Sequence, residues 1–312
     1  MRILVVGAGA MGGYFGARLV AAGRDVTFLV RPKRAQQLGA GLFVRSPQGD
    51  IQIPAPKTVT AATLRERGAP MGQPYDLVLL SCKAFDLEQA MDAFAPAMGP
   101  TSMVLPLLNG MAHIEKLQKR FGNAAVLGGQ CQISATLNPE GHVIHLNDWH
   151  VLGFGELDSS RSARIEAVSA AFAGAKFEPR LSTSILQDMW EKWIFIATMA
   201  GITCLMRASL GDIGTAGGHS IALALFDECA AIAGKNLHVP NASVSENIRK
   251  VLTTPGSTLM ASMLRDAENH NRTEHEQVLG DLLARAHGAR APVLETCLVH
   301  MRAYEARRLR EG

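Results

Sequence analysis

The first residues whose spacing suggests chemistry are three glycines, Gly7, Gly9 and Gly12, in the pattern G-x-G-x-x-G. A strand-like run rich in β-branched residues, 2–6, precedes them, and apolar residues at helical spacing follow them as far as Gly23. In this strand–turn–helix setting the first glycine permits a tight turn, the second lets a pyrophosphate approach the backbone, and the third packs helix against strand. The pattern therefore predicts a dinucleotide-binding turn, with the helix N-terminus holding the anion.

The residues after the next strand-like run, 25–30, bear on the choice of cofactor. That run ends at Arg31, and Lys33 and Arg34 follow. An acid at this place usually holds the ribose 2′-hydroxyl of NAD, whereas a guanidinium pairs with a 2′-phosphate in bidentate fashion. Arg31 therefore favours NADP over NAD. A solvated basic loop is an alternative explanation for Lys33 and Arg34.

Two more polar residues, Lys83 and Asn109, stand at the ends of buried strand-like runs. Each alone has an ordinary explanation, because a lysine after a strand often snorkels and Asn-Gly is often a turn. Ligands of open α/β sheets, however, bind beyond the carboxyl ends of the strands. We therefore expect both residues at the same sheet edge as the glycine turn.

Lys192 is the most informative residue of the second half, because Trp190 and Trp193 flank it. An ammonium in such surroundings is partly desolvated, which lowers its pKa toward the range useful for proton transfer. The alternative is an ion pair with Glu191 or Asp188 on the exposed side of the helix.

Ser262 and Glu274 are twelve residues apart on what reads as one long helical stretch. Glu276 is an equally plausible acid, so the residues alone do not choose between the two glutamates. His142 and His145, three residues apart on a predicted strand, point to opposite faces, and we expect no metal site.

The elements that must position these residues divide the chain into two parts. Up to residue 182, strand-like and helix-like runs alternate, which implies a doubly wound, mainly parallel α/β sheet of Rossmann type. A turn at 139–143 between two strand-like runs suggests an antiparallel pair near its end. Only helical patterns follow. We therefore expect an NADP-binding domain over 1–182 and an all-helical substrate and catalytic domain over 183–312.

Composition narrows the class of protein further. The net charge of +3 is spread along the chain, and the basic tail reads as a solvated helix end, so neither a nucleic-acid nor a membrane partner is expected. Five scattered cysteines favour a reducing cytoplasm over a disulfide framework. The apolar run 193–206 is shorter than the ~20 residues of a membrane span. The helical part is apolar enough for a homodimer interface, although a well-packed monomer would look the same.

The motifs GAGAMGG, CKAFD, LLNGM, WEKW, MASMLRD and RTEHEQVLGDLLARAHG, with Arg31 after the first, occur in this order along nearly the whole chain. In order and spacing they resemble the ketopantoate reductase family (2-dehydropantoate 2-reductases). The resemblance implies a Rossmann domain joined to a helical domain. It also implies NADPH-dependent reduction of a small-molecule 2-oxo acid to a 2-hydroxy acid, foremost 2-dehydropantoate to pantoate in pantothenate biosynthesis.

Carried over residue by residue, the resemblance makes Lys192 the general acid and places Glu274 near the nicotinamide ribose and the substrate, as the second catalytic residue. Ser262 would contact the substrate carboxylate, and Asn109 would lie along both cofactor and substrate. The choice of Glu274 over Glu276 rests on the resemblance alone. The implied cofactor contacts are Gly7, Gly9, Met11, Gly12, Arg31, Lys83, Asn109 and Ala135.

One departure from the family concerns the helix of Lys192. Members that make pantoate usually carry asparagine four and eight residues after the lysine, where this chain has Ile196 and Ala200. Each lost amide removes hydrogen bonds worth roughly 0.5–1.5 kcal/mol to a substrate. The alternatives are therefore a related NADPH-dependent reductase of a more apolar carbonyl compound, and a sensor that binds NADPH without turnover.

Overall fold

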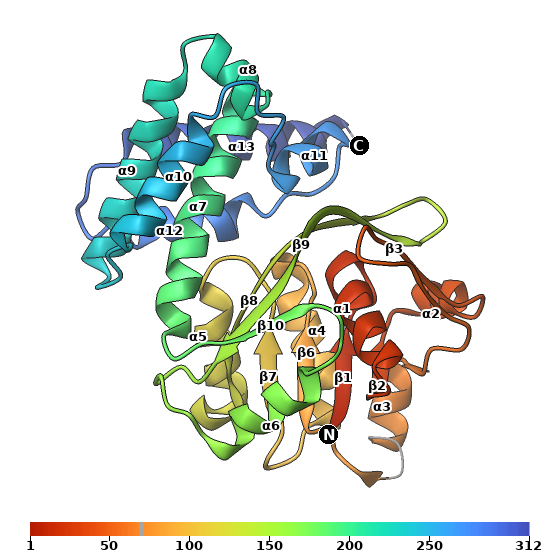
Figure 1. The fold of residues 1–312 in the computed structure, drawn as a ribbon. Helices are drawn as coiled ribbons and strands as arrows, with labels where there is room; N and C mark the ends of the chain where they lie inside the picture. Colours follow the sequence, from red (N-terminus) through yellow and green to blue (C-terminus); the bar gives the residue numbers. More distant parts are fainter. Residues whose placement is uncertain (69–71, 312) are drawn as a thin grey trace. The chain divides into compact units, whose positions relative to one another are not determined.

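The computed structural model describes residues 1–68 and 72–311 (Figure 1). Contacts within the chain group these residues into two units. The first unit comprises Met1–Leu108 and His113–Leu186, and the second comprises Asn109–Ala112 together with the chain from Gln187 onward. Helix α7 (Ile185–Met206) begins in the first unit and continues in the second.

A five-stranded parallel sheet forms the centre of the first unit. Its order is β5-β2-β1-β6-β7, all neighbours being parallel, which corresponds to the first five strands of the Rossmann order 3-2-1-4-5-6. Side chains of β6 and β7 are buried throughout, as continuous apolar runs in a parallel sheet require. The expected α/β fold class is thereby confirmed. The strands are β1 (Arg2–Val6), β2 (Asp25–Leu29), β5 (Thr58–Val59), β6 (Leu77–Leu80) and β7 (Met103–Pro106).

A second sheet in the same unit has the order β10-β9-β3-β4, with β8 paired to β9. The β8–β9 pair is antiparallel, as the turn at 139–143 predicts, but the two strand-like runs after that turn form one strand with an irregular register opposite Ser134. The sequence analysis did not anticipate β3, β4 or β10. The strands are β3 (Leu42–Arg45), β4 (Ile51–Ile53), β8 (Gly128–Leu137), β9 (Val143–Gly155) and β10 (Glu178–Leu181).

Helices of the first unit pack closely on these sheets. Helix α1 lies against β2, because Gly16 leaves room for Phe28, whose ring carbon Cε1 would be 2.4 Å from a Cβ on that glycine. Ser162 caps α6 through its side chain, which accepts from the Ile165 amide. The helices are α1 (Ala10–Ala21), α2 (Pro32–Leu38), α3 (Ala61–Arg67), α4 (Leu87–Phe94), α5 (Ala112–Phe121) and α6 (Ala163–Phe172).

Every regular element among the described residues of the second unit is a helix (Figure 1). Helix α7 is largely apolar and buried, and helices α10 and α13 each pack on α9. A search of the described residues finds no helix long and apolar enough to cross a membrane. After α7 come α8 (Leu210–Thr215), α9 (His219–Lys235), α10 (Ala242–Leu252), α11 (Ser262–Glu268), a π-helix (Glu276–Gly280), α12 (Asp281–Ala284) and α13 (Pro292–Glu311).

The prediction that one helical stretch carries both Ser262 and Glu274 is wrong. Helix α11 ends at Glu268, and the π-helix begins only at Glu276. The break has a local cause: the Asn269 side-chain amide donates to Arg265 O at 2.8 Å, and His270 adopts a left-handed backbone with φ +56°. Ser262 and Glu274 therefore lie on separate elements.

Candidate functional site

The glycine turn after β1 is fixed by the neighbouring strands of the parallel sheet. Gly7 has φ +91°, a conformation that favours glycine, and its amide donates to Leu29 O at 2.9 Å. The Ser81 hydroxyl, just after β6, donates to Val6 O at 2.9 Å and to Gly7 O at 3.1 Å. A Cβ on Gly12 would lie 2.0 Å from Gly7 O and 2.2 Å from Ser81 Oγ. The helix start packs so closely on the turn and on Ser81 that position 12 has room only for glycine.

Gly9 and the first turn of α1 form an open surface suited to an anion. Gly9 is the N-cap of α1, no side chain caps the helix, and its first turn contains no acidic residue. A Cβ built on Gly9 meets nothing within 4 Å. Helix N-termini carry unsatisfied N–H groups and partial positive charge, so a pyrophosphate approaching this glycine would be well held. The residues present fit a dinucleotide.

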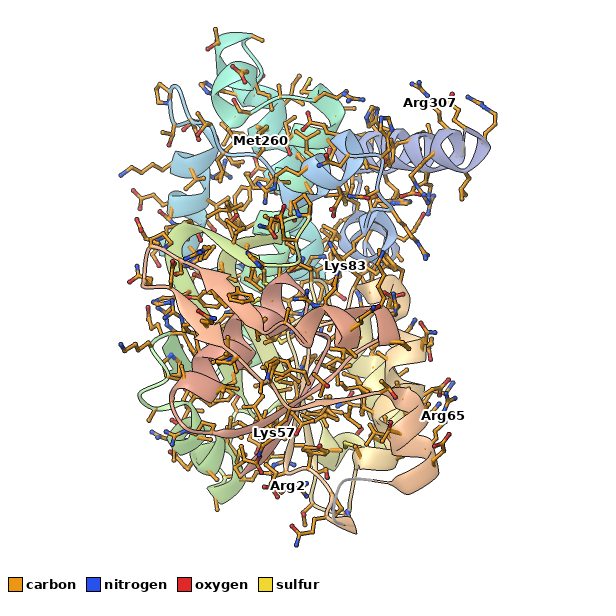
Figure 2. All side chains as sticks on the ribbon, turned by 90° about the vertical axis from the view of Figure 1, so that its right-hand side faces the viewer. Arg2, Lys57, Arg65, Lys83, Met260 and Arg307 are labelled. Carbon is orange, nitrogen blue, oxygen red and sulfur yellow. The ribbon has the colours of Figure 1, made fainter. Side chains whose placement is uncertain are left out.

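Arg31 and Lys83 both follow strands at the carboxyl edge of the parallel sheet. In Figure 2, Lys83 lies at the end of the first unit away from Arg2 and Lys57, which mark the starts of β1 and β5. Arg31 is exposed and forms an ion pair with Asp86 at 3.0 Å. It also donates to Gln89 Oε1 at 3.2 Å, so its guanidinium is held beside the edge that carries the glycine turn.

Arg34 does not lie in a solvated loop, because it belongs to α2 and braces the glycine turn. Its Nε donates to Ala8 O and its Nη1 donates to Gly141 O, both at 2.9 Å. Burial lowers the pKa of this guanidinium below its ordinary value. Lys33, also on α2, is exposed. The basic-loop alternative thus fails for Arg34, which acts as a structural contact of the turn.

Met11 and Ala135 pack against one hydrophobic core in the first unit. The Met11 sulfur lies 3.9 Å from Cys131 Sγ, and Cys131 is on the same strand, β8, as Ala135. The α1 N-terminus and the middle of β8 therefore lie close together.

In the second unit, Lys192 is half-buried on α7 beside two buried indoles, Trp190 and Trp193. Glu191, one of the two acids offered as alternative partners of Lys192, makes other contacts: its Oε1 accepts from the backbone amide of Asn241 at 2.9 Å and from the Asn241 side chain at 2.7 Å. Glu191 thus anchors the start of α10 to α7.

The π-helix brings together the segments of three predicted site residues, Asn109, Lys192 and Glu274. Gly110 packs so closely on it that a Cβ there would be 2.7 Å from Gln277 O, and the Trp193 indole donates to Val278 O at 2.9 Å. Glu274 lies just before the helix and is half-buried. A π-helix within a helical segment is a recurrent feature of functional sites.

Glu276, the other candidate acid, has a clear structural partner on α13. Arg302 donates to both of its carboxylate oxygens, from Nε at 2.7 Å and from Nη2 at 2.9 Å. The guanidinium lowers the pKa of the Glu276 carboxyl. Glu276 thus takes part in a structural ion pair between the π-helix and α13.

Ser262 is exposed at the start of α11. Its neighbour Ala261 donates to Thr203 Oγ1 at 3.4 Å, and Thr203 lies about three helical turns beyond Lys192 on α7. Ile196, one turn beyond Lys192, is half-buried, and Ala200 is buried.

Sequence reasoning missed two residues that hold the glycine turn and its edge, Ser81 and Asp86. The signal for Ser81 was a hydroxyl directly after a strand in register with β1. The signal for Asp86 was an acid three residues after Lys83, at the N-cap of α4.

Two protein-family models match most of the chain. The family described as ketopantoate reductase PanE/ApbA matches residues 3–159, and its C-terminal counterpart matches residues 184–305. The chain belongs to the ketopantoate reductase family. It is therefore a member of an oxidoreductase family that acts on CH–OH groups.

Several relatives and solved structures cover nearly the whole length of this ketopantoate reductase family member. An uncharacterised oxidoreductase of Bacillus subtilis, YkpB, is 38% identical over 98% of this chain and 99% of its own length. The structure of 2-dehydropantoate 2-reductase from Geobacter metallireducens has a TM-score of 0.85 at 26% identity, covering 97% of this chain and 99% of that one. A ternary structure of D-mandelate dehydrogenase with NADH and anilino(oxo)acetate has a TM-score of 0.87 at 20% identity, covering 99% of both chains, and shows the shared fold.

Proposed function

We propose that this protein reduces a 2-oxo acid to the 2-hydroxy acid with NADPH, and that 2-dehydropantoate is the first substrate to test. The observation that carries the proposal is the convergence of the Asn109, Lys192 and Glu274 segments on one π-helix. Membership of the ketopantoate reductase family supports the reaction class.

The first unit supplies the proposed cofactor contacts. Gly7, Gly9 and Gly12 with the α1 N-terminus would hold the pyrophosphate, and Arg31 would pair with the 2′-phosphate. Lys83 would lie along the cofactor beyond the strand ends. When bound, NADPH supplies the hydride that reaches the carbonyl carbon.

The second unit supplies the proposed proton donor. Negative charge develops on the carbonyl oxygen as the carbon is reduced, and the Lys192 ammonium would stabilise that charge and donate the proton. Asn109 and Glu274 would orient the substrate and the ammonium, and Ser262 would bind the substrate carboxylate. Placing these groups in reacting geometry is the main task of the protein chain.

A second candidate substrate class, 2-oxo acids with apolar side chains, is favoured by Ile196 and Ala200. Neither side chain can hydrogen-bond a substrate hydroxyl, and a site without such partners binds apolar groups at less cost. The D-mandelate dehydrogenase of the same fold gives a reason to include an aromatic 2-oxo acid in the test.

The experiment is steady-state oxidation of NADPH by the purified protein with 2-dehydropantoate and a series of aliphatic and aromatic 2-oxo acids, repeated with NADH. Turnover with at least one 2-oxo acid supports the reductase, and the ranking of kcat/KM identifies the substrate class. Binding of NADPH without turnover on any of them would overturn the reductase and favour a sensor.

A further inference from the structure

A run of polar side chains connects α13 to the segment that carries Glu274. The Arg308 Nε donates to Glu305 Oε2 at 2.8 Å. The other oxygen of Glu305 accepts from the Thr273 amide at 2.7 Å and from the Thr273 hydroxyl at 3.1 Å. One carboxylate of α13 thus holds both the backbone and the side chain of the residue before Glu274.

The run continues on the other side of Glu274. The Thr273 hydroxyl lies 2.9 Å from His275 Nδ1, and His275 Nε2 lies 3.4 Å from Glu276 Oε1. The Thr273 hydroxyl thus lies between Glu305 and His275, and the imidazole lies between Thr273 and the Glu276 carboxylate. Arg302 closes the run through its bidentate contact with Glu276.

Burial makes the inner part of this run rigid. Thr273 is 3% exposed and His275 is 8% exposed, and burial lowers the pKa of His275. Buried hydrogen bonds to a carboxylate are strong and leave few alternative geometries. By contrast, Arg307 on the same helix pairs with Glu311 in a solvent-exposed site.

The held segment leads directly into the π-helix, which α13 also contacts. Gly280 leaves space for the Glu276 carboxylate on its way to Arg302, because a Cβ there would be 2.5 Å from Glu276 Oε2. Gly110 and Trp193 dock on the carbonyls of the following turn. Contacts that hold residues 273–276 therefore also hold the π-helix, on which the segments of Asn109 and Lys192 pack.

We propose that Thr273, Glu305 and Arg302 are positioning residues for the reaction. Glu305 holds the backbone before Glu274, Arg302 holds the Glu276 side chain after it, and through the π-helix they fix the segments of Asn109 and Lys192. This inference rests on the proposed function and adds three residues to it, none of which touches the reacting atoms. It predicts losses of kcat with cofactor binding intact.

The test compares Thr273→Val, which removes the hydroxyl at nearly constant volume, with Thr273→Ser, which keeps it. Arg302→Gln probes the exposed end of the run and should fold even if the buried variant does not. Arg307→Gln is the matched control, an ion-paired arginine of the same helix outside the run. Each variant is assayed for kcat and KM with the best 2-oxo acid, NADPH affinity by fluorescence, and amide hydrogen exchange of residues 269–280.

We expect kcat per NADPH-binding site to fall about tenfold in Thr273→Val, because small misplacements of reacting groups are costly, and to recover in Thr273→Ser. NADPH affinity should stay within about twofold, and exchange of the 269–280 amides should rise. Arg302→Gln should show a smaller loss of the same kind, and Arg307→Gln none.

Two results would overturn the inference. Normal turnover in both Thr273→Val and Arg302→Gln, beside an active wild type, would remove the positioning role and leave the proposed function intact. A wild type without turnover on any 2-oxo acid would remove the proposed function, and the positioning role with it.

Discussion

Replacing Gly9 by alanine separates cofactor binding from folding at the glycine turn. The added methyl meets no protein atom within 4 Å, and the backbone of Gly9 (φ −77°) suits any residue. The folding cost should therefore stay at about 1 kcal/mol or less, the preference of an N-cap for glycine over alanine. The same methyl would occupy the surface that a pyrophosphate must approach.

The expected loss of affinity follows from the contacts at risk. A hydrogen bond to a charged group contributes about 1.5–3 kcal/mol, so displacing one phosphate contact should weaken NADPH roughly 10- to 100-fold. Gly12→Ala should behave differently, because its Cβ would lie 2.0 Å from Gly7 O. Overpacking of that kind costs about 1–3 kcal/mol of folding free energy.

The assay is thermal unfolding of the cofactor-free proteins by circular dichroism, with NADPH titration by fluorescence. Gly234→Ala on α9 is the control, since its Cβ would make only an ordinary 3.6 Å contact with Val239 Cγ2. Its NADPH affinity should match the wild type. If Gly9→Ala binds NADPH as tightly as the wild type, or loses more melting temperature than Gly12→Ala, the glycine turn is not the pyrophosphate site.

Three further outcomes follow from the same geometry. Lys192→Ala should lower kcat by about 100-fold or more, the usual contribution of a general acid, with NADPH affinity nearly unchanged; equal kcat would remove its role. Arg31→Asp should weaken NADPH far more than NADH in parallel titrations, and an unchanged preference would contradict the 2′-phosphate contact. Arg164 lowers the pKa of Glu156, so this pair stabilises the fold above the unfolded pKa of about 4.5, and the stabilisation disappears as pH falls through the lower folded pKa. Glu156→Gln should therefore lower the melting temperature at neutral pH and flatten its fall on acidification; an unaltered slope would contradict the linkage.

The parallel sheet and its glycine turn could be predicted because their signals are local. An apolar run, a glycine at the turn and a helical pattern after it lie within the first 23 residues, and each is decided by neighbours in sequence. The short strands β3, β4 and β10 gave no such signal. β3 pairs with β9, where Val44 lies opposite Val143, and no local pattern contains that contact. β4 joins the sheet only through its pairing with β3, and β10 pairs with β9 across the intervening α6.

The same limit applies to the candidate site. Lys192 stands out in the sequence because tryptophans flank it, whereas Glu274 and Glu276 look alike until α13 places Arg302 on one of them. The helix break before Glu274 depends on the Asn269 side chain and on the left-handed backbone of His270. In the sequence alone, the helical spacing of apolar residues continues past both positions and hides the break. The periodic pattern of a sequence predicts neither the long-range partner of a side chain nor the backbone torsion of a single residue.

Asn109–Ala112 follow the last strand of the parallel sheet, yet their contacts group them with the helical unit. A fusion that exchanges the helical parts of two such proteins by a single crossover before α7 would therefore split this set of contacts. Gly110 would then meet a foreign π-helix across a gap that has no room for a methyl group. Chimeric designs in this fold need junctions around residues 109–112 as well as before α7, so that these residues and the helices they contact come from the same parent protein.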